Sequence, residues 1–341
     1  MRSRIIVLCL VVSAIAGTLM FVDSQMSSRI NLPKGEEIYY VDKGAGASAV
    51  LSDLKNKGII RISLPLMKIY ARLTESEGPL KAGEYELTCD MNHRDMLGLL
   101  RSGRVKQYAI TFPEGIRCKD WLDVLQVEFK GEDAGLMPGC DTLMKSLDST
   151  MVAAEGQFYP DTYHYVRGDN YLDILQRAHD RMLKVLEEAW NNRQPDLPLS
   201  SQYEALILAS IVEKETGAEE DRSLVASVFI NRLNKGMRLQ SDPTIIYGLN
   251  DYEGNIKRRH ITQETPYNTY VISGLPPTPI SNPGRASIVA VLNPPDTDYL
   301  YFVAKGNGRS YFSTTLEEHN KAVREFQINN RSDKYRSSPE P

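Results

Sequence analysis

Residues 204–248 read EALILASIVEKETGAEEDRSLVASVFINRLNKGMRLQSDPTIIYG, and they predict two consecutive helices followed by a polar stretch. Leu208, Ile211 and Glu215 are three or four residues apart, so they share one face of the first helix. Glu213 points roughly the other way. A carboxyl group held against an apolar wall has a raised pKa and can donate a proton near neutral pH. Glu215, which also meets the negative end of the helix dipole, is therefore the candidate acid.

Outward from this run, apolar periodicity and turn residues predict a mixed α+β protein. Ser201 and Glu204 form a capping box at the start of the first helix, and Asn282-Pro283 resembles a cap followed by proline before another helix. Residues 127–150 look loop-like. Helices are predicted at 47–56, 64–73, 93–101, 119–126, 170–193, 201–217, 221–235, 284–292 and 315–326, and strands at 37–42, 84–88 and 107–112, with a hairpin made by 299–304 and 309–313.

The N-terminus carries a segment that predicts the compartment. Arg2 and Arg4 precede Ile5–Val22, which has eighteen residues without a charge. A helix of that length spans about 27 Å, enough to cross a bilayer, and the basic flank favours a cytoplasmic N-terminus. We therefore expect residues 1–4 in the cytoplasm, a single anchor at 5–22 and a linker at 23–35. The alternative is a signal peptide cleaved after the small residues Ala14 and Ala16.

Composition excludes several classes of function. The 341 residues suffice for two domains, and a net charge of −4 without a Lys/Arg block gives no sign of a nucleic-acid partner. The five histidines are scattered and no HExxH motif occurs, so no metal site or cofactor is expected. Beyond the apolar segment, Cys89, Cys118 and Cys140 allow at most one disulfide, which leaves one thiol.

Two tracts downstream of Glu215 are rich in hydrogen-bonding side chains. They read RLQSDPTIIYG at 238–248 and ETPYNTYVISGLPPTPISNPG at 264–284. Polar loops with aromatic rings suit sugars, because hydroxyls need donors and acceptors while pyranose faces stack on rings. Ordinary turn chemistry is the alternative for each tract. One acid beside a polar groove favours cleavage of a glycosidic bond.

Five tracts carry a resemblance to a known family. They are EGxFYPDTY from 155, ASIVEKETG from 209, VFINRLxxGMxLQSDPTxxYG from 228, TPYNTYxxxGLPPxPISNPG from 265 and YLYFVAxGxGxxxF from 299. In this order they resemble the YceG/MltG family of endolytic peptidoglycan transglycosylases, over roughly residues 36–328. The resemblance implies an α+β protein with an N-terminal transmembrane helix, a small LysM-like α+β module at 36–105 and a mixed, mainly helical YceG-like catalytic domain at 106–328. Residues 329–341 are expected to be a disordered tail.

The resemblance also implies a place and a reaction. Such proteins are anchored in the cell inner (cytoplasmic) membrane and face the periplasm or cell exterior. Glu215, the second acid of EKE, would protonate the oxygen between N-acetylmuramic acid and N-acetylglucosamine in nascent strands. The muramyl 6-hydroxyl would then close on the anomeric carbon and leave 1,6-anhydro ends, which ends elongation. This lyase chemistry needs no cofactor, and peptidoglycan synthases are candidate partners.

Other polar residues of the same tracts are candidates for orienting groups or for the glycan groove, namely Glu213, Asp161, Asn231, Arg232, Gln240, Asp242, Tyr247, Asn268 and Tyr270. Two alternatives remain beside the leading hypothesis. One is a non-catalytic peptidoglycan-binding or scaffold protein of the wall-synthesis machinery. The other is a hydrolase of the muramidase type, which would need a second carboxylate.

Overall fold

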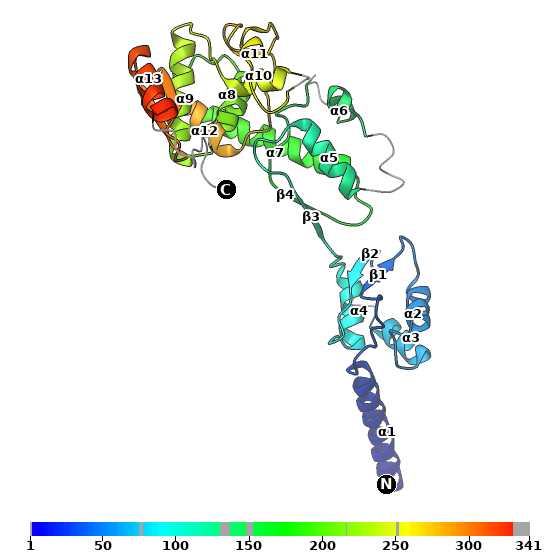
Figure 1. Cartoon of the computed structure of the whole chain (residues 1–341). Helices are drawn as coiled ribbons and strands as arrows, with labels where there is room; N and C mark the ends of the chain where they lie inside the picture. Colours follow the sequence, from blue (N-terminus) through cyan, green and yellow to red (C-terminus); the bar gives the residue numbers. More distant parts are fainter. Residues whose placement is uncertain are drawn as a thin grey trace. The chain divides into compact units, whose positions relative to one another are not determined.

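The chain folds into two compact units (Figure 1). A computed structural model describes residues 2–74, 78–129, 137–147, 153–215, 217–249 and 252–329. Unit 1 comprises Met1–Ala109 and His164–Asp169, and unit 2 comprises Ile110–Tyr163 and Asn170–Pro341. The division passes through two paired strands, β3 (Tyr108–Thr111) and β4 (Thr162–Tyr165). The sequence predicts β3 but not β4.

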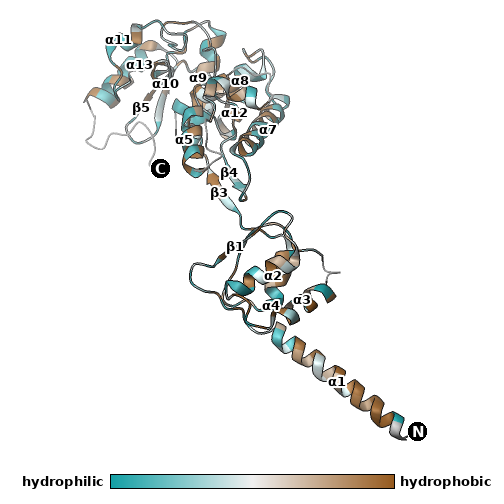
Figure 2. Cartoon of the chain, turned by 90° about the vertical axis from the view of Figure 1, so that its right-hand side faces the viewer, coloured by the Kyte–Doolittle hydropathy of each residue, from teal (hydrophilic) through white to brown (hydrophobic). Residues whose placement is uncertain are grey.

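Unit 1 begins with a long apolar helix, α1 (Arg2–Met26), coloured brown along most of its length in Figure 2. Its stretch Arg4–Met26 is long and apolar enough to cross a membrane, a test that a signal sequence also passes. The helix continues past the predicted end at Val22. The Met26 side chain is fully buried in the core of unit 1, and Ile30 N–H donates to Met91 O over 3.0 Å. The predicted linker at residues 23–35 thus includes apolar side chains that pack in the core of unit 1.

The rest of unit 1 is a small α+β module. It contains β1 (Ile38–Val41), α2 (Ala47–Asn56), α3 (Leu64–Leu73), β2 (Gly83–Glu86) and α4 (His93–Ser102). The strands β1 and β2 are antiparallel, with Tyr39 opposite Tyr85. Asn92 and Asp95 form a capping box at the start of α4, and Gly103 ends it with a φ of 72°. The predicted α+β module is present here, and its likeness to LysM stays a prediction.

Unit 2 is mainly helical. Between β3 and β4 lie α5 (Cys118–Glu128) and α6 (Cys140–Ser146). The elements that follow β4 are α7 (Tyr171–Asn191), α8 (Gln202–Glu215), α9 (Glu219–Asn234), α10 (Asp242–Gly248), α11 (Arg258–Thr262), α12 (Arg285–Leu292), β5 (Tyr301–Ala304), β6 (Ser310–Ser313), α13 (Leu316–Val323) and the π-helical turn η3 (Arg324–Asn329). The hairpin β5–β6 is antiparallel, as predicted. Helix α6 falls inside the stretch predicted to be loop-like, and Cys140 at its start is disulfide-bonded to Cys118.

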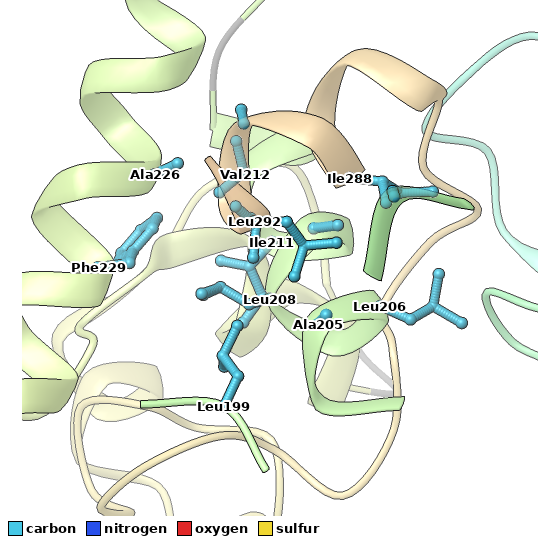
Figure 3. Close-up of a cluster of buried hydrophobic side chains, with 14 of the residues drawn as sticks. Leu199, Ala205, Leu206, Leu208, Ile211, Val212, Ala226, Phe229, Ile288 and Leu292 are labelled. Carbon is cyan, nitrogen blue, oxygen red and sulfur yellow. The ribbon is translucent and has the colours of Figure 1, made fainter. Parts of the chain in front are cut away.

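Helix α8 lies at the centre of unit 2. All of its residues from 205 to 212 are buried, so it is covered on every side rather than on one face. A helix of this kind belongs inside a core. Figure 3 shows Ile211 and Val212 among side chains of the neighbouring helices, which include Phe229 of α9 and Leu292 of α12. The core thus fixes the C-terminal end of α8, where Glu215 lies.

Candidate active site

Glu215 is the last residue of α8, and a serine side chain holds its carboxylate. The Ser241 hydroxyl donates a hydrogen bond to Glu215 Oε1. Desolvation raises the pKa of Glu215 to about 7, and the charge of Asp242 adds to the rise, while the Ser241 hydrogen bond and Arg232 oppose it. The carboxyl is therefore protonated in a substantial fraction of molecules at neutral pH. A general acid needs this property.

A cavity of about 470 Å³ opens beside Glu215. Its walls come from the end of α8, from α9, from the segment 239–242, from Tyr270 and from β5, β6, α13 and η3. It brings together Glu215 with four other residues that the sequence indicated. The lining residues are Glu215, Arg232, Leu239, Gln240, Asp242, Tyr270, Tyr301, Phe302, Val303, Ala304, Ser310, Leu316, His319, Val323 and Gln327.

Arg232 holds two walls of this cavity together. Its Nε donates to Leu300 O and its Nη1 donates to Leu239 O, each over 2.7 Å. Its guanidinium carbon also lies 5.3 Å from the centre of the Tyr301 ring. The positive charge is thus fixed between the strand β5 and the segment that carries Ser241. The guanidinium is therefore held in position before any ligand enters the cavity.

The polar rim beside Glu215 is held by the segment 240–242. Gln240 has a φ of 50°, a left-handed conformation that costs a non-glycine residue energy and so needs support from its surroundings. Its N–H donates to Thr269 O over 3.1 Å. Asp242 Oδ1 accepts a hydrogen bond of 2.7 Å from the Tyr270 hydroxyl. The two segments that the sequence marked as polar tracts therefore meet at this rim.

Glu213 and Asp161 have other partners. Glu213 Oε2 accepts hydrogen bonds from Gly284 N–H over 3.0 Å and from the Ser287 hydroxyl over 2.7 Å. Its carboxylate thus caps the start of α12. Asp161 forms an ion pair with Arg181. Neither carboxylate is among the residues that line the cavity.

The side chains of three more candidates form hydrogen bonds with other segments of unit 2. Asn231 Nδ2 donates to Thr297 O over 2.6 Å and to Tyr299 O over 3.0 Å. Asn268 Nδ2 donates to three backbone oxygens, the shortest being Gln263 O at 2.7 Å. The Tyr247 hydroxyl donates to Glu155 Oε2 over 3.2 Å. These contacts lie outside the cavity lining.

Ser241 and the wall made by Tyr301 and His319 are absent from the candidates that the sequence supplied. Ser241 stands directly before Asp242-Pro243, where the pattern indicates only a helix start. It is the N-cap of α10, yet its hydroxyl does not cap that helix and donates to Glu215 instead. The Tyr301 and His319 rings stack with centres 5.2 Å apart, although they belong to different elements. Only the motif YLYFVA, which includes Tyr301, could have pointed to this wall.

The arrangement supplies one acid, one fixed cation and aromatic rings. In the described ranges, no group of three or more His, Cys, Asp or Glu side chains is placed to hold a metal ion. Asp242 is the other carboxylate among the described lining residues. Chemically, the site can protonate a leaving oxygen and bind a polar, ring-bearing ligand.

Comparison with known proteins gives consistent matches. An endolytic murein transglycosylase of Bacillus subtilis (strain 168) is 31% identical over 321 residues, which cover 89% of this chain and 86% of that relative. An endolytic murein transglycosylase of Streptococcus pneumoniae (strain ATCC BAA-255 / R6) is 29% identical, and the match covers 84% of this chain but 57% of that relative. The crystal structure of a putative YceG-like protein from Listeria monocytogenes gives a TM-score of 0.53 at 29% identity and covers 84% of this chain and 99% of that one.

The model of the YceG-like family matches residues 39–325. This range contains Glu215, Ser241 and every residue of the cavity lining except Gln327. It also extends over both units, from β1 into η3. The match covers well over half of the chain, and the chain therefore belongs to the YceG-like family.

Proposed function

We propose that this chain is an endolytic murein transglycosylase that cuts nascent peptidoglycan strands without water. The observation that carries the proposal is the Glu215 carboxyl, whose pKa is raised to about 7 while Ser241 fixes one of its oxygens. The matches to proteins named endolytic murein transglycosylase support the same activity.

In the proposed reaction, Glu215 donates its proton to the oxygen that joins N-acetylmuramic acid to N-acetylglucosamine. The bond between that oxygen and the anomeric carbon breaks. The 6-hydroxyl oxygen of the muramyl residue bonds to the same carbon, and its proton passes to the Glu215 carboxylate. The acid is thereby regenerated, no water is consumed, and a 1,6-anhydro end remains.

The groups around Glu215 fit this division of roles. Ser241 holds Oε1, and Oε2 is the oxygen that we assign to proton transfer. Hydrolytic glycosidases use a pair of carboxyl groups, and the second one activates water or attacks the sugar. Here Asp242 accepts a hydrogen bond from Tyr270, which suits an orienting group better than a base. The rings of Tyr270 and Tyr301 and the polar groups of Gln240 and Arg232 are candidates for sugar contacts.

We also propose that α1 is retained as a single membrane span with its N-terminus in the cytoplasm. The catalytic part would then lie outside the membrane, where its substrate is assembled. The disulfide between Cys118 and Cys140 supports this side, because structural disulfides persist in oxidising compartments. Peptidoglycan strands are the proposed partner, and wall synthases are candidates for a complex with this chain.

Digestion of purified sacculi by the full-length protein tests the activity. Glu215→Gln keeps the shape of the side chain but removes the acid, so turnover should fall by about a hundred- to ten-thousand-fold. The circular dichroism spectrum should stay unchanged, since the variant removes no packing. Near-normal turnover in this variant would mean that another residue is the catalytic acid, and Glu213 would be the next one to test. Release of no soluble fragments by the wild type would favour the scaffold alternative.

A further inference from the structure

Helix α3 carries two apolar faces, and the core of unit 1 uses one of them. Met67 and Ala71 are buried in that core. On the other face Ile69 is 58% and Leu73 78% exposed, while Tyr70 at its edge is half-buried against the same core. Large apolar side chains grouped on one exposed face mark a contact surface more often than scattered ones do. Spacings of i, i+3, i+4 and i+7 define this second face, the α3 stripe, as Leu66, Ile69, Tyr70 and Leu73.

The α3 stripe lies where α1 enters unit 1. Asp23, near the end of α1, forms an ion pair with Arg94 of α4. Tyr70 of the stripe also lies close enough to Arg94 to interact with its charge. Both views in Figures 1 and 2 show α3 beside the C-terminal end of α1 within unit 1. The stripe is thus next to the point where the apolar helix would leave a bilayer.

The connection between α1 and this module is packed. Met26 is fully buried and Ile30 is 4% exposed, and both belong to the same hydrophobic cluster as Met67 of α3. A membrane-spanning α1 would therefore hold the module directly at the lipid surface. Because so little free chain separates them, α3 cannot move far from the headgroups.

The charges beside the stripe suit the same surface. Lys68 and Arg72 follow each other at i and i+4 on α3, next to the stripe on the side of Ile69. Helices that lie in a membrane interface combine Leu and aromatic residues on one face with Lys and Arg beside it. Basic side chains there are attracted to anionic lipid headgroups, and tyrosine rings favour the headgroup level.

We propose that the α3 stripe inserts shallowly into the outer face of the membrane that α1 crosses, with Lys68 and Arg72 at lipid phosphates. This proposal rests on α1 being retained as a span, and it is independent of the chemistry at Glu215. The module then forms a second membrane contact and serves as a fixed base for the chain. A protein partner or a second copy of the chain is the competing occupant of the stripe.

Spin labelling of the full-length protein in lipid nanodiscs tests the proposal. The background variant Cys9→Ser/Cys89→Ser removes the two free thiols and leaves the Cys118–Cys140 disulfide. A nitroxide is attached at Leu73→Cys, with Val127→Cys on α5 as the control, because Val127 is also apolar and 61% exposed. The nanodiscs contain phosphatidylcholine with phosphatidylglycerol. Collision rates with lipid-soluble oxygen and with a water-soluble nickel chelate are then compared.

The label at residue 73 should meet oxygen in preference to nickel, with a ratio several-fold above that at residue 127. The double variant Lys68→Glu/Arg72→Glu should lower this ratio in anionic discs more than in neutral discs. A ratio equal to the control would mean that the stripe faces water, and it would overturn the proposal. Protection from both reagents would mean a protein occupant and would overturn it as well. So would an intact mass showing that α1 has been removed.

Discussion

At the scale of the residue, Ser241 separates this site from an ordinary helix end. Its position before Asp242-Pro243 is that of an N-cap, and a serine hydroxyl there normally accepts a hydrogen bond from its own helix. The Ser241 hydroxyl is instead directed to Glu215, which belongs to a helix more than twenty residues earlier. A local pattern cannot reveal such a contact, because it depends on how α8 and α10 pack.

The variant Ser241→Ala should move the pH dependence of cleavage. A hydrogen bond to the ionised carboxylate lowers its pKa, so removing the Ser241 hydroxyl should raise the pKa of Glu215 above about 7. Activity requires the protonated acid and falls as pH rises through that pKa. The alkaline limb of kcat/KM should therefore shift to higher pH, while the maximal rate falls because the carboxyl loses its orientation.

Ser241→Thr is the matched control, since it keeps a hydroxyl and should keep the alkaline limb in place. The measurement is the pH profile of fragment release from sacculi by each variant. An alkaline limb that stays where it is in Ser241→Ala would show that the serine does not set the acidity of Glu215.

Glu155 is a second buried carboxyl that the sequence did not single out. It is 7% exposed and accepts hydrogen bonds from Cys118 N–H and from Tyr247. Burial raises the pKa of Glu155 to about 7, against the effect of those hydrogen bonds. The sequence could not show this burial, because it comes from contacts with the distant residues Cys118 and Tyr247.

This raised pKa predicts a pH-dependent stability. The folded state binds the Glu155 proton more tightly than the unfolded chain, in which the pKa of this carboxyl is near its ordinary value of 4.5. The contribution of Glu155 to the free energy of unfolding should therefore be greatest below that value and decline by up to roughly 3 kcal/mol as pH rises to about 7. Glu215 adds to the same slope. Denaturant unfolding at several pH values measures it, and Glu155→Gln should flatten it in part. An unchanged slope in that variant would refute this assignment.

At the scale of the element, strong periodicity predicted well and weak local signals did not. The bounds of α2 and α3 agree with the predicted 47–56 and 64–73, since amphipathic runs ended by turn residues are clear. Helix α6, with seven residues, is too short for periodicity to distinguish it from a loop. The start of α12 was predicted to have an Asn282-Pro283 cap, but its N-cap is Gly284 and its acceptor is Glu213 from α8.

Glu213 and Glu215 should differ in what they contribute, with Glu213 acting on stability and Glu215 on activity. Glu213→Ala should leave the Gly284 N–H and the Ser287 hydroxyl without their acceptor, which costs about 1–3 kcal/mol of stability. The alkaline limb of activity should stay unchanged, because Glu215 keeps its partners. Thermal unfolding and the pH profile measure these two effects. Loss of all activity in a fully folded Glu213→Ala protein would contradict the structural role.

At the scale of the whole molecule, the sequence predicted the order of the helix, module and catalytic unit better than the contacts that connect segments. The apolar helix, the α+β module and the helical unit with the polar tracts were all recognisable from pattern. The packing of Met26 and Ile30 was not, because isolated apolar residues in a polar stretch give no periodic signal. Similarly, the sequence suggests that Asn231 and Asn268 are groove residues, whereas in the structure their side-chain amides donate hydrogen bonds to backbone oxygens.

The anchor gives a prediction about the mature chain. If α1 is retained, the N-terminal peptide recovered from membranes should include Ile5–Val22, and carbonate extraction should not release the protein. The physical reason is the length of the apolar stretch Arg4–Met26. Intact mass spectrometry of the membrane fraction makes the measurement. A mature protein that begins at Gly17 or later would mean a processed signal sequence instead.

In the proposed mechanism Glu215 acts alone and the muramyl 6-hydroxyl is the nucleophile. Digestion of sacculi in ¹⁸O-water, followed by mass spectrometry of the fragments, tests it most directly. We expect 1,6-anhydromuramyl ends without ¹⁸O, one water lighter than hydrolytic products, and a spread of strand lengths early in the digest. Reducing ends that carry ¹⁸O would contradict it, because they would require an activated water and a second catalytic carboxylate.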